Sequence, residues 1–208
     1  VNITEATTTE SFIKTYDRTG ALMDRTKFEL GDDKACTGVY NMKFEVNNVS
    51  NVAVSYDVSS VLLTEGVSEI YTSHGDRTVS QDGRLLDGTV TTVKTVNGAN
   101  ANSNVINVGA GQKAVVEVEV KLSDADKAYI SDSFENGMYV EGFILLKAIS
   151  GGKVDLNVPV LAFFGDWTKA PIFDEEYYDT NKDELNAGLD PEDKLMADTY
   201  PTKVTGRL

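Results

Sequence analysis

Cysteine and histidine are almost absent from this chain of 208 residues, which contains one of each. A single cysteine, Cys36, forms no intramolecular disulfide, so the class of small disulfide-framed domains is excluded. A single histidine, His74, would have to act as the base of any serine or cysteine hydrolase triad. No Gly-x-Ser-x-Gly elbow or comparable serine motif accompanies it. The sequence therefore predicts no catalytic residue, and it favours His74 as a histidine of an exposed loop.

Positive charge and long apolar runs are also scarce. Lys and Arg number 19 against 33 for Asp and Glu, which gives a net charge of -14. A nucleic-acid backbone or an anionic membrane surface would be repelled by such a chain. The apolar runs at residues 143–146 and 158–164 are far shorter than the roughly 20 residues of a membrane-spanning helix. We expect no nucleic-acid partner and no membrane insertion.

The start of the chain lacks the basic and apolar regions of a signal peptide. It begins at Val1 rather than at a methionine. We interpret the chain as a piece excised from a longer protein.

Alternation of apolar and polar residues dominates the middle of the sequence. It runs through residues 40–46, 52–58 and 116–122, and a period of two predicts strands with one buried face. Asn48 and Ser50 supply turn chemistry between the first two of these segments. We therefore expect residues 52–58 to be the antiparallel partner of residues 40–46.

Two later segments, residues 139–148 and 156–164, are apolar on both faces toward their ends. Such a pattern is typical of strands in the centre of a sheet, and residues 150–152 supply the turn between them. Weaker strand signals lie at residues 27–30, 69–73, 89–95 and 105–108.

One helix is expected among these strands. Ser123 followed by Asp126 resembles a capping box, and the segment ends at Asn136 and Gly137. Many short strands, frequent turn signals and a single helix indicate an all-β protein. We predict an antiparallel β-sandwich of immunoglobulin or fibronectin type with one short helix.

The two ends differ from the middle. Residues 1–25 are polar and show no clear periodicity, so we expect a lead-in segment before a sandwich at residues 26–175. Residues 176–208 continue an acidic stretch and are expected to be a solvated connector. Within it, Asp179, Asn181 and Asp183 place oxygen atoms at alternate positions, as a calcium loop does. Glu184 occupies the sixth position, where such a loop needs glycine, so we predict no metal, and a calcium-stabilised linker stays an open alternative.

A motif of aromatic residues closes the last predicted strand. It consists of Phe163, Phe164, Gly165, Asp166, Trp167 and Pro171. The rings concentrate apolar area, glycine permits a tight bend, and proline stiffens the chain beyond it. The pattern predicts a structural corner or an interdomain contact.

Three stretches together resemble a known family. They are residues 32–40, residues 136–143 and residues 158–174, and they occur in the order in which the family has them. The resemblance is to the fibronectin-like domain that follows the catalytic domain in cell-envelope subtilases of the lactocepin and C5a peptidase group. It covers roughly residues 26–175. None of the family's catalytic motifs occurs in this chain, so no catalytic residue carries over.

The resemblance implies a function through partners. The parent protein would be a secreted, cell-wall-associated serine protease of a Gram-positive bacterium. This domain would pack on the catalytic and neighbouring domains and help to position or select protein substrates.

The alternative that we keep is a stand-alone adhesion or carbohydrate-binding module, since sandwiches of this kind serve many functions. It would need exposed, coplanar rings among Tyr71, Trp167, Tyr177 and Tyr178.

Overall fold

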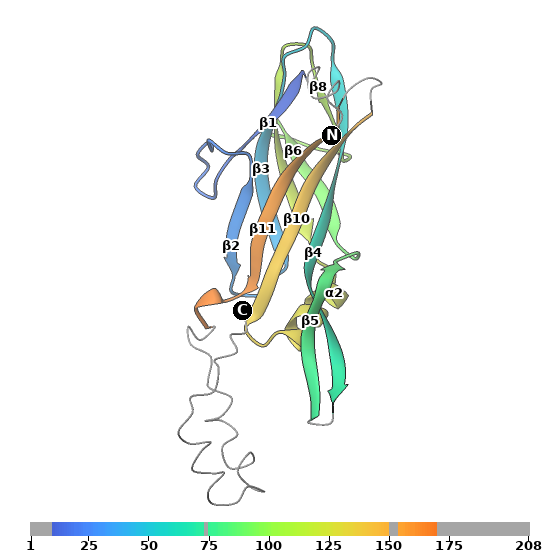
Figure 1. The fold of residues 1–208 in the computed structure, drawn as a ribbon. Coiled ribbons are helices and arrows are strands. Elements are labelled where there is room, and N and C mark those ends of the chain that lie inside the picture. The colour runs from blue at the N-terminus through green and yellow to red at the C-terminus, as the bar shows by residue number, and fades with distance from the viewer. Residues whose placement is uncertain (1–9, 73–74, 150–153, 170–208) are drawn as a thin grey trace, which may run out of the picture. The chain divides into compact units, whose positions relative to one another are not determined.

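The computed structural model describes residues 10–72, 75–149 and 154–169. Within these ranges the chain forms two packed β-sheets, and Figure 1 shows β2, β11, β10 and β4 side by side in one of the two layers. Sheet I has the strand order β1 (Ser11–Thr15), β3 (Val39–Asn48), β9 (Lys113–Lys121), β6 (Val90–Val96) and β7 (Ala99–Asn100). Sheet II has the order β2 (Phe28–Asp33), β11 (Leu156–Gly165), β10 (Gly137–Ala148), β4 (Val54–Thr72) and β5 (Gly75–Leu85), with β8 (Val105–Val108) also paired to β4.

The strand pairs are antiparallel except for β11 and β2, which run parallel. The two strands predicted to be central, β10 and β11, pair from Gly137 opposite Gly165 to Leu146 opposite Leu156. Each has a second neighbour, β4 beside β10 and β2 beside β11. The predicted all-β sandwich is confirmed.

The core lies between the sheets and follows the alternation read from the sequence. In β9, Val116, Val118 and Val120 are buried, with Phe44 of β3 in the same cluster. Sheet II contributes residues such as Ile144, which is fully buried. Each such side chain contributes about 1.5–3 kcal/mol on burial, so this shared layer holds the two sheets together.

The expected pairing of residues 40–46 with 52–58 is wrong, because β3 and β4 belong to different sheets. Asn48 shows the reason. Its side-chain amide donates to the carbonyl oxygens of Val52 at 2.8 Å and Gly109 at 3.0 Å. Its carboxamide oxygen accepts from the Ser50 hydroxyl at 2.8 Å. These bonds stabilise a corner at which the chain crosses between sheets, and turn residues alone do not distinguish such a corner from a hairpin.

Part of the segment expected to be a lead-in is a strand. Ser11, Ile13 and Thr15 are buried and alternate with exposed Phe12 and Lys14 along β1. This strand pairs with β3 at the edge of sheet I. The sandwich thus includes residues that precede position 26.

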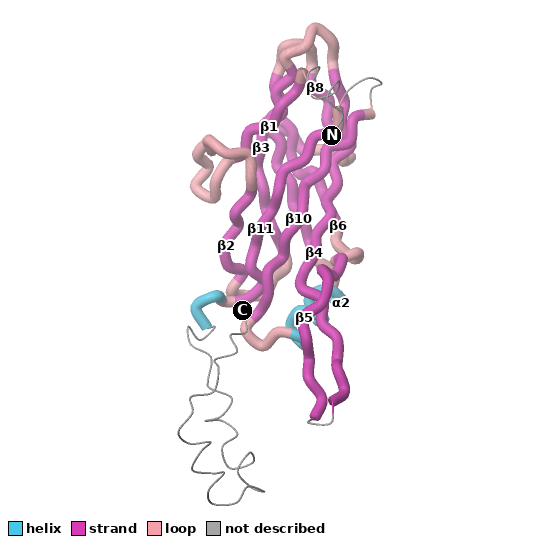
Figure 2. Tube along the Cα trace, viewed as in Figure 1, coloured by secondary structure: helices cyan, strands magenta, loops and turns pink. Residues whose placement is uncertain are grey.

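The predicted helix is confirmed as α2 (Asp124–Ser133), and Figure 2 shows it beside the strands β4 and β5. The Ser123 hydroxyl accepts from the Asp126 N–H at 3.1 Å and donates to the Asp126 carboxylate at 2.7 Å. Ser123 and Asp126 thus stabilise the start of the helix through two hydrogen bonds. Tyr129 donates its hydroxyl to the Glu65 carbonyl at 3.1 Å, which fixes the helix against β4. A short 3-10 helix, η1 (Trp167–Lys169), follows β11.

Candidate functional site

The aromatic motif at the end of β11 divides between the two faces of sheet II. Phe164 points inward and is buried in the core. Phe163 points to the outer face, yet only 6% of it is exposed. Its ring contacts those of Trp167 and Tyr139, with centroid distances of 5.2 and 5.3 Å. The three rings form an aromatic cluster outside the core.

The backbone around this cluster is tightly constrained. Gly165 has φ of +134°, and a Cβ there would lie 2.9 Å from the Asn136 carbonyl oxygen, so a side chain would be strained and crowded. Asp166 forms an ion pair with Lys34 at 3.0 Å. The Trp167 N–H donates to the Asp32 carboxylate at 3.1 Å. Phe163, Gly165, Asp166 and Trp167 therefore lie at the outer end of β11, whereas Phe164 lies in the core and Pro171 is outside the described residues.

The aromatic cluster continues into an exposed apolar surface on the outer face of sheet II. Its members have exposed fractions of 39% to 49%, and we call them the outer strip: Val61, Tyr139, Phe143, Leu161 and Trp167. Cross-strand pairing places Phe143 opposite Val61 and Glu141 opposite Leu161. Exposed apolar side chains that adjoin one another over several strands are a mark of an interaction surface.

The outer face of sheet I has a different character. Lys43 pairs with Glu117 at 3.1 Å, Lys94 with Glu119 at 3.5 Å, and Lys113 with Glu45 at 3.0 Å. Burial alone would raise the pKa of Glu45. The hydrogen bonds from Lys113 and Asn47, together with the positive charge of Lys113, outweigh burial and hold that pKa below its ordinary value. Charged pairs therefore cover the middle of this face, and its exposed apolar side chains, Phe12 and Val90, lie on β1 and β6, which β3 and β9 separate.

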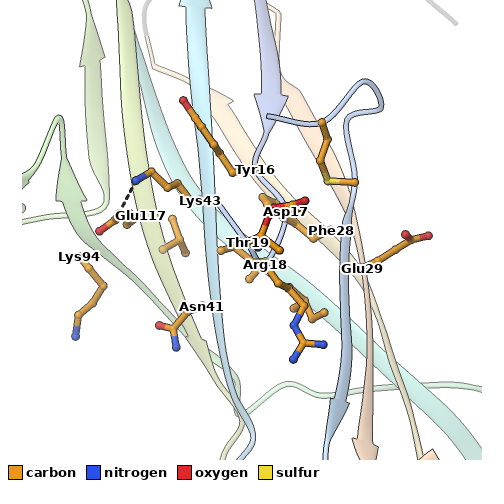
Figure 3. A pocket seen from close by; sticks show the side chains of 14 residues that line it. Tyr16, Asp17, Arg18, Thr19, Phe28, Glu29, Asn41, Lys43, Lys94 and Glu117 are labelled. Carbon is orange, nitrogen blue, oxygen red and sulfur yellow. Dashed lines mark hydrogen bonds and ion pairs between the residues drawn. The ribbon is translucent and has the colours of Figure 1, made fainter. Parts of the chain in front are cut away.

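A cavity of about 570 Å³ lies at the open edge of β3, beside the segment that links β1 to β2 (Figure 3). Its lining includes Asn41, Met42 and Lys43, consecutive residues whose side chains alternate between the two faces of the strand. Lys94 of β6 and Glu117 and Val118 of β9 also line it, so the cavity extends from the open edge of β3 across that strand. Phe28 and Leu30 of β2 line it as well.

A second cavity of about 210 Å³ continues from the first toward the end of β2. Arg18, Leu30 and Asn41 line both cavities, and Figure 3 shows the Arg18 side chain between β3 and β2. We call the two cavities together the edge groove.

Several residues singled out in the sequence lie outside the described residues. They are His74, Tyr177, Tyr178 and the residues of the calcium-like segment, Asp179, Asn181 and Asp183, and the side chain of Tyr71 is not described. In the described ranges no three His, Cys, Asp or Glu side chains gather as a metal site requires. None of the helices in the described part of the chain has the length and hydrophobicity that a membrane crossing needs.

The profile of the Fn3-like domain matches residues 32–161. The chain belongs to this family. A PI-type proteinase of Lactococcus lactis subsp. cremoris is 32% identical over 148 residues, which are 70% of this chain and 6% of that protein. The PIII-type proteinase of strain SK11 matches to the same extent. A PII-type proteinase of Lacticaseibacillus paracasei is 36% identical over 69 residues, which are 33% of this chain and 3% of that protein.

The match confirms the family that the sequence resembles and leaves most of the proteinases unmatched. This Fn3-like domain spans about 6% of the length of the lactococcal proteinases. Among solved structures, a PapD-like domain of human CEP192 covers 74% of this chain at 9% identity, with a TM-score of 0.37.

Two features of the candidate surfaces escaped the sequence prediction. The role of Tyr139 as a cover for Phe163 was missed, although its place opposite that residue follows once β10 and β11 are paired. The edge groove was missed because the segment around Arg18 was assigned to a lead-in. The sequence of β1 gives little signal for a strand, because its buried positions include the polar Ser11 and Thr15 and its exposed positions include the apolar Phe12.

Proposed function

We propose that this Fn3-like domain is a non-catalytic accessory domain of a secreted, cell-wall-associated, subtilisin-like serine protease. It packs on the catalytic domain or on another neighbouring domain through the outer strip, and it helps to position protein substrates. The observation that carries this proposal is the exposed apolar surface that Phe143, Leu161 and Trp167 form on sheet II.

The chemistry of the outer strip suits contact with a folded domain. Covering apolar area contributes roughly 25 cal/mol per Å², so a strip that spans three strands contributes several kcal/mol in total. Glu141 is exposed between the apolar positions of the strip. A partner surface with apolar side chains around one Lys or Arg would cover the apolar residues of the strip and pair with the Glu141 carboxylate. Covalent attachment in one polypeptide raises the effective concentration of such a partner, so a modest contact is enough.

The domain organisation belongs to the same proposal. We propose a sandwich domain at residues 26–175, to which the described strand β1 is added, with a lead-in segment before it. We propose that residues 176–208, whose composition is acidic, are a connector. Their high charge favours solvation over packing.

The test uses the longer protease that contains this domain. Phe143→Lys and Leu161→Lys place charge in the outer strip, and Thr92→Lys places the same charge on the exposed outer face of sheet I, opposite Glu119. We expect the two strip variants to lower the unfolding temperature of the protease domain and its rate on a folded protein substrate. Turnover of a short chromogenic peptide should change much less, and Thr92→Lys should behave like the unchanged protein. Equal behaviour of all three variants would reject docking through the strip.

The carbohydrate-binding alternative depends on Trp167, which is 49% exposed. Its ring is tilted by 45° to that of Tyr139 at a centroid distance of 5.3 Å, so the two do not offer a flat platform for a sugar. Contact with Phe163 also gives Trp167 a packing role. Saturable glycan binding that is lost in Trp167→Ala, with the fold retained, would favour the alternative.

A further inference from the structure

β1 leaves sheet I halfway along β3 and exposes the remaining edge of that strand. The two strands pair from Ser11 opposite Asn48 to Thr15 opposite Phe44. One further main-chain bond follows, from the Tyr16 N–H to the Lys43 carbonyl at 3.0 Å. Beyond it, in the described ranges, residues 39–42 pair only with β9 on their other side. A free edge of this kind is a template for another extended chain.

The main-chain groups at this edge follow from the alternation of antiparallel pairing. Since Lys43 directs its carbonyl toward β1, the next residues to face the same side are Asn41 and Val39. The Val39 N–H already donates to the Thr37 hydroxyl at 3.2 Å. An added strand would therefore bond to the N–H and C=O of Asn41 and to the C=O of Val39. The edge groove lies directly beside these groups.

Arg18 gives the edge groove a charge preference. Its guanidinium packs on Gly31, where a Cβ would lie 2.5 Å from an Arg18 nitrogen, so the bulged backbone of β2 leaves room for it. Among the described residues Arg18 has no ion-pair partner. The other charged groups of the groove are partnered: Lys43 with Glu117, Lys94 with Glu119, Glu29 with Lys27, Asp17 with Thr19 and Ala21, Asp32 with Trp167, and Asp33 with Thr37 and Gly38.

The same groove limits how much negative charge an occupant can carry. Asp32 and Asp33 line the second cavity together with Arg18. One carboxylate would pair with the guanidinium, whereas further carboxylates would meet these two aspartates and the strongly negative chain as a whole. The complementary chemistry is an extended peptide with a single acidic side chain among uncharged residues.

We propose that the edge groove binds such a peptide as an added strand on β3, with its carboxylate on Arg18. The inference deepens the proposed accessory function and rests on it, because the peptide is taken to be an extended segment of the protein substrate. The outer strip and the edge groove then have separate partners. The strip contacts a neighbouring domain, and the groove holds substrate.

The test measures peptide binding to the isolated 208-residue chain by amide NMR. The probe is an acetylated, amidated six-residue peptide of alternating valine and threonine with one central glutamate. We expect saturable shifts of the Asn41 and Val39 amide signals, with little change for Phe143 and Leu161 on the outer face of sheet II. Replacing the peptide glutamate by glutamine, or using a peptide with three glutamates, should weaken binding.

Two matched pairs of changes separate the main-chain contact from the charge. In an added strand, alternate residues direct their N–H groups toward β3, and the residues between them direct theirs to solvent. Of two adjacent central amides of the peptide, N-methylation of the one that faces β3 should therefore abolish binding. N-methylation of the one that faces solvent should not. On the protein, Arg18→Gln should weaken binding about fivefold, as expected for one partly exposed charge pair. Lys147→Gln on the exposed face of β10 is the control and should leave binding unchanged.

Three results would overturn the proposal. They are the absence of saturable shifts at the groove, equal tolerance of both methylated peptides, and self-association of Arg18→Gln without peptide binding. The last would show that Arg18 only shields the edges of the sheets from pairing with another copy. None of these results bears on docking through the outer strip, because Phe143→Lys and Leu161→Lys leave the groove intact.

Discussion

The two sheets enclose the same core, but their outer faces carry different kinds of side chains. On sheet I, Lys43, Lys94 and Lys113 each reach an acidic partner. The exposed apolar residues of that face, Phe12 and Val90, lie on strands that are not neighbours. On sheet II, Phe143 and Leu161 stand exposed at equivalent outward positions. Alternation alone requires only that one face of each strand be apolar. The second apolar face of β10 and β11 therefore exceeds what folding needs, and it is the observation on which the proposed docking contact rests.

The largest expected effect is a difference in the free energy of unfolding between substitutions on the inner and on the outer face of β10. Ile144 and Phe143 are neighbours on β10, the first fully buried and the second 44% exposed. Ile144→Ala removes core volume and should lower the free energy of unfolding by about 2–5 kcal/mol. Phe143→Ala should lower it by less than about 1 kcal/mol. Urea unfolding of both variants measures the difference, and equal losses would mean that Phe143 serves the fold of the isolated domain.

A smaller effect is expected at the aromatic cluster. Trp167→Ala uncovers Phe163 and removes two ring contacts. The free energy of unfolding should fall by about 1–2 kcal/mol, because an aromatic pair stabilises the fold beyond the contribution of the apolar area that it buries. Thermal unfolding followed by near-ultraviolet circular dichroism checks this. An unchanged unfolding temperature would indicate that the ring only serves a partner.

The smallest expected effect concerns the charged face of sheet I and depends on pH. The folded pKa of Glu45 is lowered, so this group stabilises the fold above its unfolded pKa of roughly 4.3, and that stabilisation is lost as the pH falls through the folded value. Lys113→Met should raise the pKa of Glu45 and lower the unfolding temperature at pH 7 by less than Trp167→Ala does. The difference from the unchanged protein should shrink as the pH falls below the unfolded pKa of roughly 4.3 and through the folded pKa. A difference that does not shrink with falling pH would assign the effect to packing of the Lys113 stem.

The part of this molecule that sequence predicts well is the part that depends on local periodicity. Val116, Val118 and Val120 alternate cleanly, so β9 and its buried face follow from the sequence alone. Which strands become neighbours depends on contacts between distant residues. The bond from Asn48 to Gly109 turns an expected hairpin into a crossing between sheets, and no local pattern specifies it.

The candidate surfaces show the same limit. The motif from Phe163 to Trp167 is recognisable in the sequence as a cluster of rings. Its division between the core and the outer face required the register with β10, which sets Tyr139 opposite Phe163. The edge groove required knowing where β1 ends against β3, which is a tertiary property.

The central claim is that the outer strip is covered in the longer protease. Hydroxyl-radical footprinting measures the oxidation rates of Tyr139, Phe143 and Trp167 in the isolated chain and in that protease, with exposed Phe12 of β1 as the internal reference. We predict that the three strip residues are protected severalfold in the protease while Phe12 reacts equally in both. Equal oxidation of Phe143 and Trp167 in both proteins would contradict docking through this face.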